Sequence, residues 1–303
     1  MEGTVPAFSG WIGSKFARAA QSGPHLLFQG ASRREVERFF SLDADLAAIA
    51  RQIDVDPVIH AAVRSRWGLR IIRQEPWECL ASFILSSFNN IPRLTGMLDR
   101  LASRFGEPVN DGLSLRRGSA RASFGHPSVV TSLSLGRALP SRMGAGGTLP
   151  ARPRDVPCAD SPTRGLNPLF HRFPSPEALA RVPERALRNL GLGFRAPYLK
   201  AAAQRVASGS VDLEDWRKLE DEELRRALLT IPGIGEKVVE CAMLFGYGRS
   251  AAFPVDVWIG RAMRAWYFRG RKVTDRQIRA FARRHFGPHC GWAQQYLYCQ
   301  ARA

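Results

Sequence analysis

A short break between two apolar helical stretches constrains the fold more than any other feature of this sequence. Residues 228–237 read Leu-Leu-Thr-Ile-Pro-Gly-Ile-Gly-Glu-Lys. Pro232 ends the first helix, and Gly233 and Gly235 permit the positive φ angles and close backbone approach of a tight hairpin. The N–H groups that open the second helix form a seat for a phosphate. The segment predicts a helix-hairpin-helix that holds a DNA backbone without reading its sequence, with an ordinary turn between two helices as the alternative.

Apolar residues recur at helical spacing through most of the chain. The pattern covers residues 35–104 and resumes from Ser175 to the end. Ser175 and Thr274 each precede a helical stretch and are expected to cap it. The alternation of a half-buried strand is almost absent, so only short extended pieces are expected, at residues 70–73 and within residues 1–31. These patterns predict a mostly α fold whose helices form one body of two lobes.

The chain divides into four predicted segments. Residues 1–34 form a poorly defined N-terminal segment, and residues 35–112 form the first part of the helical body. Residues 113–166 are rich in Ser, Gly, Pro and Arg, carry eight arginines against two aspartates, and show no sustained periodicity. We therefore expect a disordered insertion there. Residues 167–303 complete the helical body and contain the hairpin.

The charge of the chain indicates a polyanionic partner. The formal net charge is +17 and the pI is about 10.8, and neutralised phosphates release counterions that drive association. The insertion supplies part of this charge. No apolar run of membrane-spanning length and no secretory signal is found, so we expect a soluble protein inside the cell that binds nucleic acid and no membrane. We also expect a monomer. A weak organelle transit peptide is the alternative for the first thirty residues.

The cysteines do not form a recognisable framework. The five cysteines include no CxxC pair, which disfavours a disulfide framework and a zinc site, and no four lie close together near the C-terminus, as an iron–sulfur cluster would require. No metal site is predicted.

Two charged residues suggest covalent chemistry. Lys237 lies in the first turn of the second hairpin helix, where the positive helix end disfavours an ammonium ion and so favours the free amine that a nucleophile needs. Asp256 follows nineteen residues later, at the start of the next helix. An aspartate at that position is more often a helix cap, which is the alternative.

Together, these residues resemble the 8-oxoguanine DNA glycosylase family of the helix-hairpin-helix, Gly/Pro-rich, aspartate superfamily. The resemblance extends from about Phe39 to Ala303, interrupted by the insertion. It is carried by the Lys237/Asp256 pair and by four segments, Arg73–Leu80, Asn89–Met97, Leu190–Tyr198 and Gly291–Gln294.

The resemblance implies a bifunctional enzyme that acts on double-stranded damaged DNA. Lys237 would attack the anomeric carbon as the lesion base leaves, and Asp256 would stabilise the cationic sugar and orient or deprotonate the lysine. The resulting Schiff base can undergo β-elimination and nick the strand. No cofactor is required, and a structural monovalent cation at the hairpin is expected. The enzyme would act in the nucleus or mitochondrion of a eukaryote, or in the cytoplasm and nucleoid of a bacterium.

The resemblance also implies how the flipped nucleotide is recognised. Cys241 and Tyr298 would sandwich the lesion base while Gln294 bonds its Watson–Crick edge. Without the resemblance, Cys241 and Tyr298 are more typical of core packing. The residues implied to fill the emptied stack and read the orphaned cytosine are Asn89, Asn90, Arg93, Phe194 and Arg195. For the asparagines, a polar helix start is the alternative.

Three departures from the family pattern affect recognition. Phe88 stands where the family often has a third asparagine facing the orphaned cytosine, so we expect relaxed discrimination of the opposite base. Trp258 stands where some members have a histidine that contacts the lesion phosphate. Only about 35 residues precede the helical body, so the N-terminal β domain of eukaryotic members is expected to be largely absent or replaced by unrelated sequence.

Two other functions fit the same residues. The chain could be a glycosylase for a different base lesion, or a non-catalytic or defective helix-hairpin-helix DNA-binding protein. The lysine and aspartate at their family spacing argue against the second, because binding alone needs neither.

Overall fold

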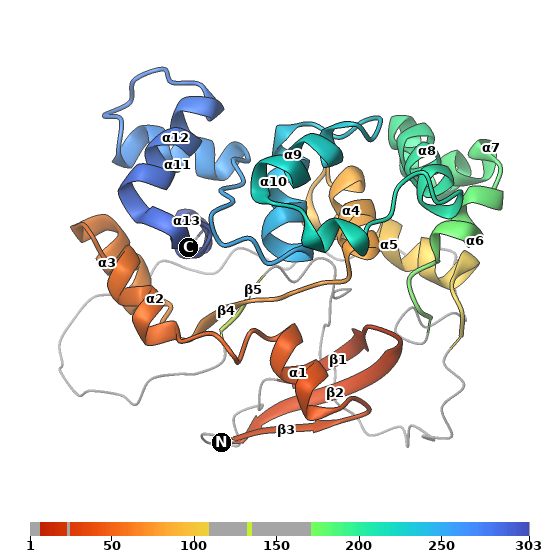
Figure 1. The fold of residues 1–303 in the computed structure, drawn as a ribbon, viewed down its shortest axis with the longest axis horizontal. Coiled ribbons are helices and arrows are strands. Elements are labelled where there is room, and N and C mark those ends of the chain that lie inside the picture. Colours follow the sequence, from red (N-terminus) through yellow and green to blue (C-terminus); the bar gives the residue numbers. More distant parts are fainter. Residues whose placement is uncertain (1–6, 23–24, 109–131, 135–170, 303) are drawn as a thin grey trace, which may run out of the picture.

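The computed structural model describes residues 7–22, 25–108, 132–134 and 171–302 (Figure 1). The mostly α, two-lobed fold predicted from the sequence is confirmed. The helices before residue 110 are α1 (Arg33–Phe39), α2 (Leu46–Ile53), α3 (Pro57–Ser65), α4 (Pro76–Leu85) and α5 (Ile91–Phe105). Those after residue 170 are α6 (Pro176–Arg181), α7 (Glu184–Leu187), α8 (Ala196–Ala207), α9 (Asp221–Leu229), α10 (Glu236–Cys241), α11 (Val257–Trp266), α12 (Asp275–Phe286) and α13 (Cys290–Ala301).

Helix α4 belongs to both lobes. Its residues Leu80 and Ile84 lie in the larger core, with α2, α3 and α9–α13. Ala81 and Leu85 lie in the smaller core, with α5–α8. This division follows from helical geometry, because residues one position apart point about 100° apart around the axis. Helix α4 therefore fixes the α8 region relative to the hairpin between α9 and α10.

The predicted caps are present. Ser175 accepts a hydrogen bond from Ala178 at the start of α6, and Thr274 forms a capping box with Gln277 at the start of α12. None of the described helices is long and apolar enough to cross a membrane.

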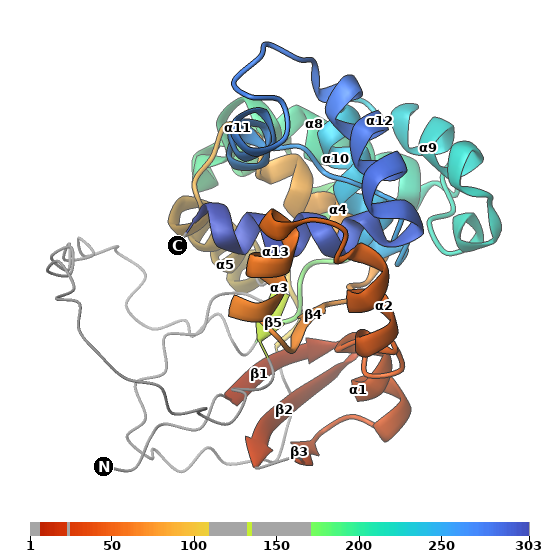
Figure 2. The same ribbon diagram turned by 90° about the vertical axis from the view of Figure 1, so that its left-hand side faces the viewer.

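The N-terminal segment contains a small antiparallel sheet. Strands β1 (Ala7–Ile12), β2 (Lys15–Ser22) and β3 (His25–Gln29) pair in that order, and the sheet lies with α1 below the other helices in both ribbon views (Figures 1 and 2). Its buried face carries Ile12, Ala17 and Ala19. The sheet is more regular than the short extended pieces expected there. The sequence did not predict it, because alanine marks a buried strand face only weakly.

A further strand lies within the predicted insertion. Strand β5 (Ser132–Ser134) pairs antiparallel with β4 (Leu69–Ile71), which confirms the extended piece expected near residue 70. The rest of residues 113–166 lies outside the described residues. The prediction of disorder for residues 113–166 therefore stays a prediction.

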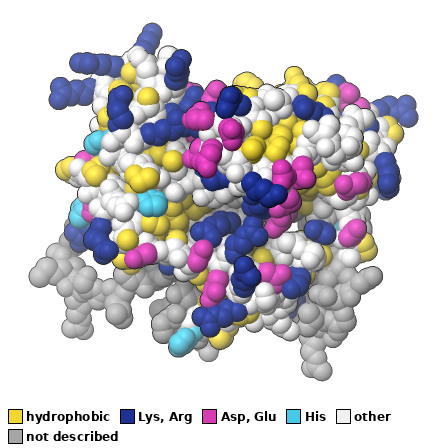
Figure 3. Space-filling view, viewed as in Figure 1, with side chains coloured by type: hydrophobic (Ala, Val, Ile, Leu, Met, Phe, Trp, Pro, Cys, Tyr) yellow, Lys and Arg dark blue, Asp and Glu magenta, His cyan; other side chains and the backbone are white. Residues whose placement is uncertain are grey.

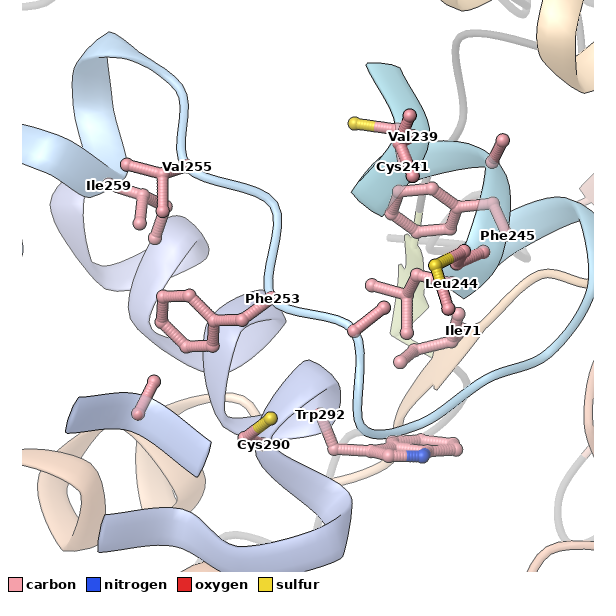
Figure 4. Packing of buried hydrophobic residues seen from close by; sticks show 14 of the residues in the cluster. Ile71, Val239, Cys241, Leu244, Phe245, Phe253, Val255, Ile259, Cys290 and Trp292 are labelled. Carbon is pink, nitrogen blue, oxygen red and sulfur yellow. The ribbon is translucent and has the colours of Figure 1, made fainter. Parts of the chain in front are cut away.

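The larger core supports the segment between the hairpin and α11. Phe253 and Val255 are buried on this segment, and Figure 4 shows the Phe253 ring above Cys290 of α13 and Val255 beside Ile259 of α11. A turn of π-helix over Ala242–Gly246 continues α10 into this core. The packing anchors both segments that carry the predicted catalytic residues.

Candidate active site

The break at residues 230–235 forms the predicted hairpin between α9 and α10. Gly233 has a φ of +80°, a left-handed conformation that favours glycine, and Gly235 is the residue before α10. A Cβ atom on Gly233 would lie 2.4 Å from Cγ of Tyr198 in α8. The glycine therefore allows both the turn and the close approach of the hairpin to the smaller lobe.

The Lys237 amine is held by a residue from a distant part of the chain. Its Nζ donates a hydrogen bond to Ser86 Oγ at 2.8 Å, across 151 residues of sequence, and lies 5.0 Å from the centroid of the Phe83 ring. Ser86 follows the last residue of α4. Sequence reasoning did not single out Ser86, because nothing local to it indicates a partner in α10.

Asp256 caps the N-terminus of α11, which is the alternative that the sequence indicates for this residue. One carboxylate oxygen, Oδ1, accepts from the backbone N–H of Ile259 at 2.8 Å. Its other oxygen makes no hydrogen bond within the part of the chain that the structure describes. Capping holds the carboxylate in place while leaving an oxygen available, so the structural and the catalytic roles are compatible.

The buried thiol of Cys241 lies near both charged groups. Burial raises the pKa of Cys241 to about 11, while Lys237 lowers this pKa and Asp256 raises it electrostatically. The thiol is therefore neutral at neutral pH. Lys237 and Asp256, the predicted nucleophile and carboxylate, therefore both influence the pKa of this predicted pocket residue.

Tyr298 lies at the C-terminal end of α13 and is paired with a residue that the sequence did not indicate. Its hydroxyl accepts from Arg302 at 2.8 Å, and burial raises the pKa of Tyr298, with Asp256 contributing in the same direction. The Arg302 guanidinium lies 5.5 Å from the Tyr298 ring and 5.9 Å from that of Trp258. These contacts bring the end of α13 to the start of α11.

Gln294 is buried on α13, and both the nitrogen and the oxygen of its side-chain amide form hydrogen bonds. Its Nε2 donates to the carbonyl of Pro254 at 3.1 Å, and its Oε1 accepts from Gln295. An amide has two N–H donors and two acceptor lone pairs. One of each therefore remains for a base edge, as the predicted role requires.

Glu240 connects the two segments that carry the predicted catalytic residues, and it was not identified from the sequence. Its fully buried carboxylate accepts from the backbone N–H of Phe253 at 2.7 Å, three residues before Asp256. It also pairs with Arg225 of α9 and with Arg283 of α12, whose Nη2 lies 3.1 Å away. A buried carboxylate shared by several arginines depends on packing between helices, which periodicity does not reveal.

The residues predicted to read the orphaned base have different surroundings. Asn90 caps the start of α5 by accepting from Arg93 N at 2.9 Å, as its alternative predicted, whereas Asn89 donates to the carbonyl of Leu85, the last residue of α4, at 3.2 Å. The side chain of Arg93 is exposed. Arg195 is buried and donates to backbone carbonyls, among them that of Ser87 at 2.7 Å. These bonds use three of its five N–H donors, so a base would have to be read by the remaining two.

Basic residues outside the insertion contribute to the surface charge. Lys and Arg side chains gather at the upper left of Figure 3, where α11 and α12 lie in Figure 1. Exposed basic residues of the connection between these helices are Arg269, Arg271 and Lys272. Among the described residues, no group of three or more His, Cys, Asp and Glu side chains could hold a metal ion.

Two family models match the chain. Residues 160–288 match the HhH-GPD superfamily of base excision DNA repair proteins, and residues 26–80 match the N-terminal domain of 8-oxoguanine DNA glycosylase. The second match begins within β3, so the sequence from residue 26 onward is similar to that domain. The expectation that unrelated sequence has replaced the domain is therefore wrong from residue 26 onward.

Relatives and solved structures cover most of the chain. It is 28% identical to a probable N-glycosylase/DNA lyase of Methanothermobacter thermautotrophicus over 90% of this chain and 76% of the relative. It is 29% identical to the N-glycosylase/DNA lyase OGG1 of Arabidopsis thaliana over 80% of this chain and 54% of the relative. The structure of a Clostridium acetobutylicum 8-oxoguanine glycosylase/lyase bound to DNA with cytosine opposite 8-oxoguanine is similar, with a TM-score of 0.75 and 26% identity over 98% of this chain and 84% of that one.

Proposed function

We infer that this chain, which belongs to the 8-oxoguanine DNA glycosylase family, releases 8-oxoguanine from duplex DNA and then cleaves the strand at the abasic site. The observation that carries this proposal is the placement of Lys237 in the first turn of α10, directly after the hairpin, with its Nζ held by Ser86 at 2.8 Å. Asp256 caps α11 through one carboxylate oxygen, which leaves the other for the reaction. A protein that only binds DNA needs neither an amine nor a carboxylate placed in this way. The relatives named as N-glycosylase/DNA lyases support the same two activities.

The proposed reaction begins at the sugar of a flipped nucleotide. Lys237 Nζ attacks C1′ as the glycosidic bond breaks and the base leaves with the electron pair. The carboxylate of Asp256 stabilises the positive charge that develops on the sugar. Ring opening converts the adduct to a Schiff base, and β-elimination then breaks the C3′–O bond. Cys241 and Tyr298 would hold the base, and Gln294 would bond its edge through the donor and acceptor it has left.

The substrate and its location follow from the same assignment. We propose that the protein acts as a monomer on damaged duplex DNA, with Gly233 and Gly235 seating a phosphate and without a catalytic cofactor. A monovalent cation at the hairpin would have only a structural role. The place of action would be the nucleoid of a bacterium, or the nucleus or mitochondrion of a eukaryote.

Single-turnover cleavage of duplexes carrying 8-oxoguanine opposite each of the four bases tests the proposed function. The expected result is base release followed by strand cleavage. Release of another lesion, with 8-oxoguanine left intact, would assign the chain to a different substrate. Binding to all duplexes without release of any base would support the non-catalytic alternative.

Ser86 is expected to act as a positioning residue for the nucleophile. The Ser86→Ala variant loses the hydrogen bond to Lys237, and a net hydrogen bond of about 1 kcal/mol corresponds to roughly a fivefold slower base release. Borohydride trapping on a preformed abasic site should slow by a similar factor, because attack by the amine is common to both assays. The control is Ser87→Ala, which changes the neighbouring hydroxyl. Equal rates for wild type and Ser86→Ala in both assays would contradict the role.

A further inference from the structure

The side-chain amide of Gln294 is held in one orientation by its two hydrogen bonds. The carbonyl of Pro254 can only accept, so the Nε2 group of Gln294, which donates to it at 3.1 Å, must face this carbonyl. The Oε1 atom of Gln294 faces away from the carbonyl and accepts from Nε2 of Gln295. The hydrogen bonds therefore run in one direction, from Gln295 through Gln294 to Pro254.

Gln295 is a buried polar residue in a largely apolar part of α13. It is 3% exposed, and Ala293 and Leu297 of the same helix belong to the larger core. Within the part of the chain that the structure describes, its buried Oε1 atom accepts no hydrogen bond. A buried acceptor without a donor destabilises a fold, and methionine, which has a similar length, would avoid this cost. The bond that its nitrogen makes to Gln294 therefore explains the amide at this position better than stability does.

The orientation matters because an amide can present its donor and acceptor in either order. Its two ends have nearly the same shape, so a rotation of about 180° around the last side-chain bond exchanges them. Along the Watson–Crick edge, a guanine-type base presents an acceptor oxygen next to a ring N–H donor, whereas an adenine-type base presents an amino donor next to a ring nitrogen acceptor. A fixed amide complements one of these orders, and an amide that rotates complements both.

The fixed amide is connected to the proposed active site. Pro254, which accepts from Gln294, lies two residues before Asp256. Tyr298, proposed to hold the base, follows Gln294 by one turn of α13. Gln295 does not need to touch the base, because its effect passes through the amide that Gln294 offers to the base edge.

We propose that Gln295 is a positioning residue that locks the amide of Gln294 in the orientation complementary to a guanine-type base, and so disfavours adenine-type lesions. The proposal rests on the proposed function, because it takes 8-oxoguanine as the base that Gln294 bonds. Loss of the Gln295 donor leaves the bond to Pro254 to hold the amide, so rotation becomes easier. The consequence is weaker binding of 8-oxoguanine and a smaller preference for it over 8-oxoadenine.

Equilibrium binding to uncleavable lesions tests the proposal without requiring catalysis. The probes are duplexes with 8-oxoguanine or 8-oxoadenine on a fluorinated sugar, which blocks base release, and a duplex with tetrahydrofuran, which has no base. The variant is Gln295→Met, which removes the donor and keeps the length of the side chain. Gln300→Met is the matched control, since Gln300 is an exposed residue of the same helix.

The expected result is a loss of affinity that depends on the base. Gln295→Met should bind the 8-oxoguanine duplex about fivefold more weakly than wild type, in line with the loss of one hydrogen bond. Its preference for 8-oxoguanine over 8-oxoadenine should fall by at least the same factor. It should bind the tetrahydrofuran duplex as wild type does, because that duplex offers no base edge to Gln294. Gln300→Met should behave like wild type on all three duplexes.

A double variant tests whether Gln295 acts through Gln294. In Gln294→Ala the amide that Gln295 positions is absent, so adding Gln295→Met should cause no further loss of affinity for the 8-oxoguanine duplex. A residue that only supports the fold would lower the affinity of wild type and of Gln294→Ala by the same factor, which would contradict the proposed role.

Three further results would overturn the proposal. The first is wild-type affinity of Gln295→Met for the 8-oxoguanine duplex, and the second is an equal loss on the tetrahydrofuran duplex, which indicates a general effect on the fold. The third is a wild type that binds the 8-oxoguanine and 8-oxoadenine duplexes equally. None of these results depends on base release. A wild type that releases no 8-oxoguanine from an ordinary sugar would reject the proposed function, while the binding measurements would still decide the role of Gln295.

Discussion

Lys237→Gln is expected to abolish borohydride trapping and to slow base release by about 10³-fold or more, as is typical when an enzyme loses its nucleophile. Glutamine has a similar length and can still hydrogen-bond Ser86, but its amide nitrogen cannot attack C1′. The measurement is covalent capture on a duplex containing 8-oxoguanine, followed by gel electrophoresis. Binding to the same duplex should be retained, because the hairpin and the pocket are unchanged.

A second lysine supplies the matched control for this prediction. Lys218 is exposed and paired with Asp215 on the surface, so Lys218→Gln removes the same charge from the protein away from the proposed site. Trapping at wild-type level by Lys218→Gln would exclude a simple effect of net charge. A covalent adduct formed by Lys237→Gln would show that another amine is the nucleophile.

Glu240→Ala is expected to lower the free energy of unfolding by about 3–5 kcal/mol, the cost of removing one partner from a buried ion pair. The carboxylate is fully buried and pairs with arginines of α9 and α12. Its loss leaves Arg225, itself mostly buried, facing a cavity with only the exposed carboxylates of Glu222 and Glu236 as counter-charges. The measurement is urea unfolding at neutral pH, compared with wild type.

Glu222→Ala provides a control that involves the same arginine. Glu222 lies 3.5 Å from Arg225, but its side chain is 73% exposed. Exposed ion pairs contribute about 1 kcal/mol or less, because water solvates both charges. Equal destabilisation by Glu240→Ala and Glu222→Ala would contradict a special role for the buried carboxylate.

Loss of Glu240 is also expected to affect the active site. Its hydrogen bond to Phe253 joins α10, which carries Lys237, to the segment that ends at Asp256. Both proposed catalytic residues therefore depend on one buried anion for their relative position. Even where Glu240→Ala remains folded, we expect slower base release than in Glu222→Ala.

Local sequence patterns predicted the parts of the site that lie within one segment. The proline and glycines of the hairpin determine where α9 ends and α10 begins, since their backbone preferences act on neighbouring residues. The positions of Lys237 and Cys241, one turn apart on α10, follow from the same periodicity. The caps at Ser175, Asn90 and Thr274 were predictable for the same reason.

The small N-terminal sheet was only partly predictable. Its inward-facing residues include Ala17 and Ala19, which are also common in helices and loops. The fold uses them because the sheet packs closely against α1, where a small side chain fits. A pattern of large apolar residues would have marked the strands more clearly.

Contacts between distant segments needed the tertiary structure. The bond from Lys237 to Ser86 spans 151 residues, and those from Arg195 to Ser87 and Phe88 span 108 and 107. Such contacts depend on how α4 packs between the lobes, and helical spacing does not encode that packing. The burial of Arg195 and its bonds to the carbonyls of Ser87 and Phe88 were therefore not predictable from the sequence, and its predicted role toward the orphaned base stays a prediction. The residues of the proposed chemistry can be read along the chain, whereas the side chains that hold them become apparent only when the helices are packed together.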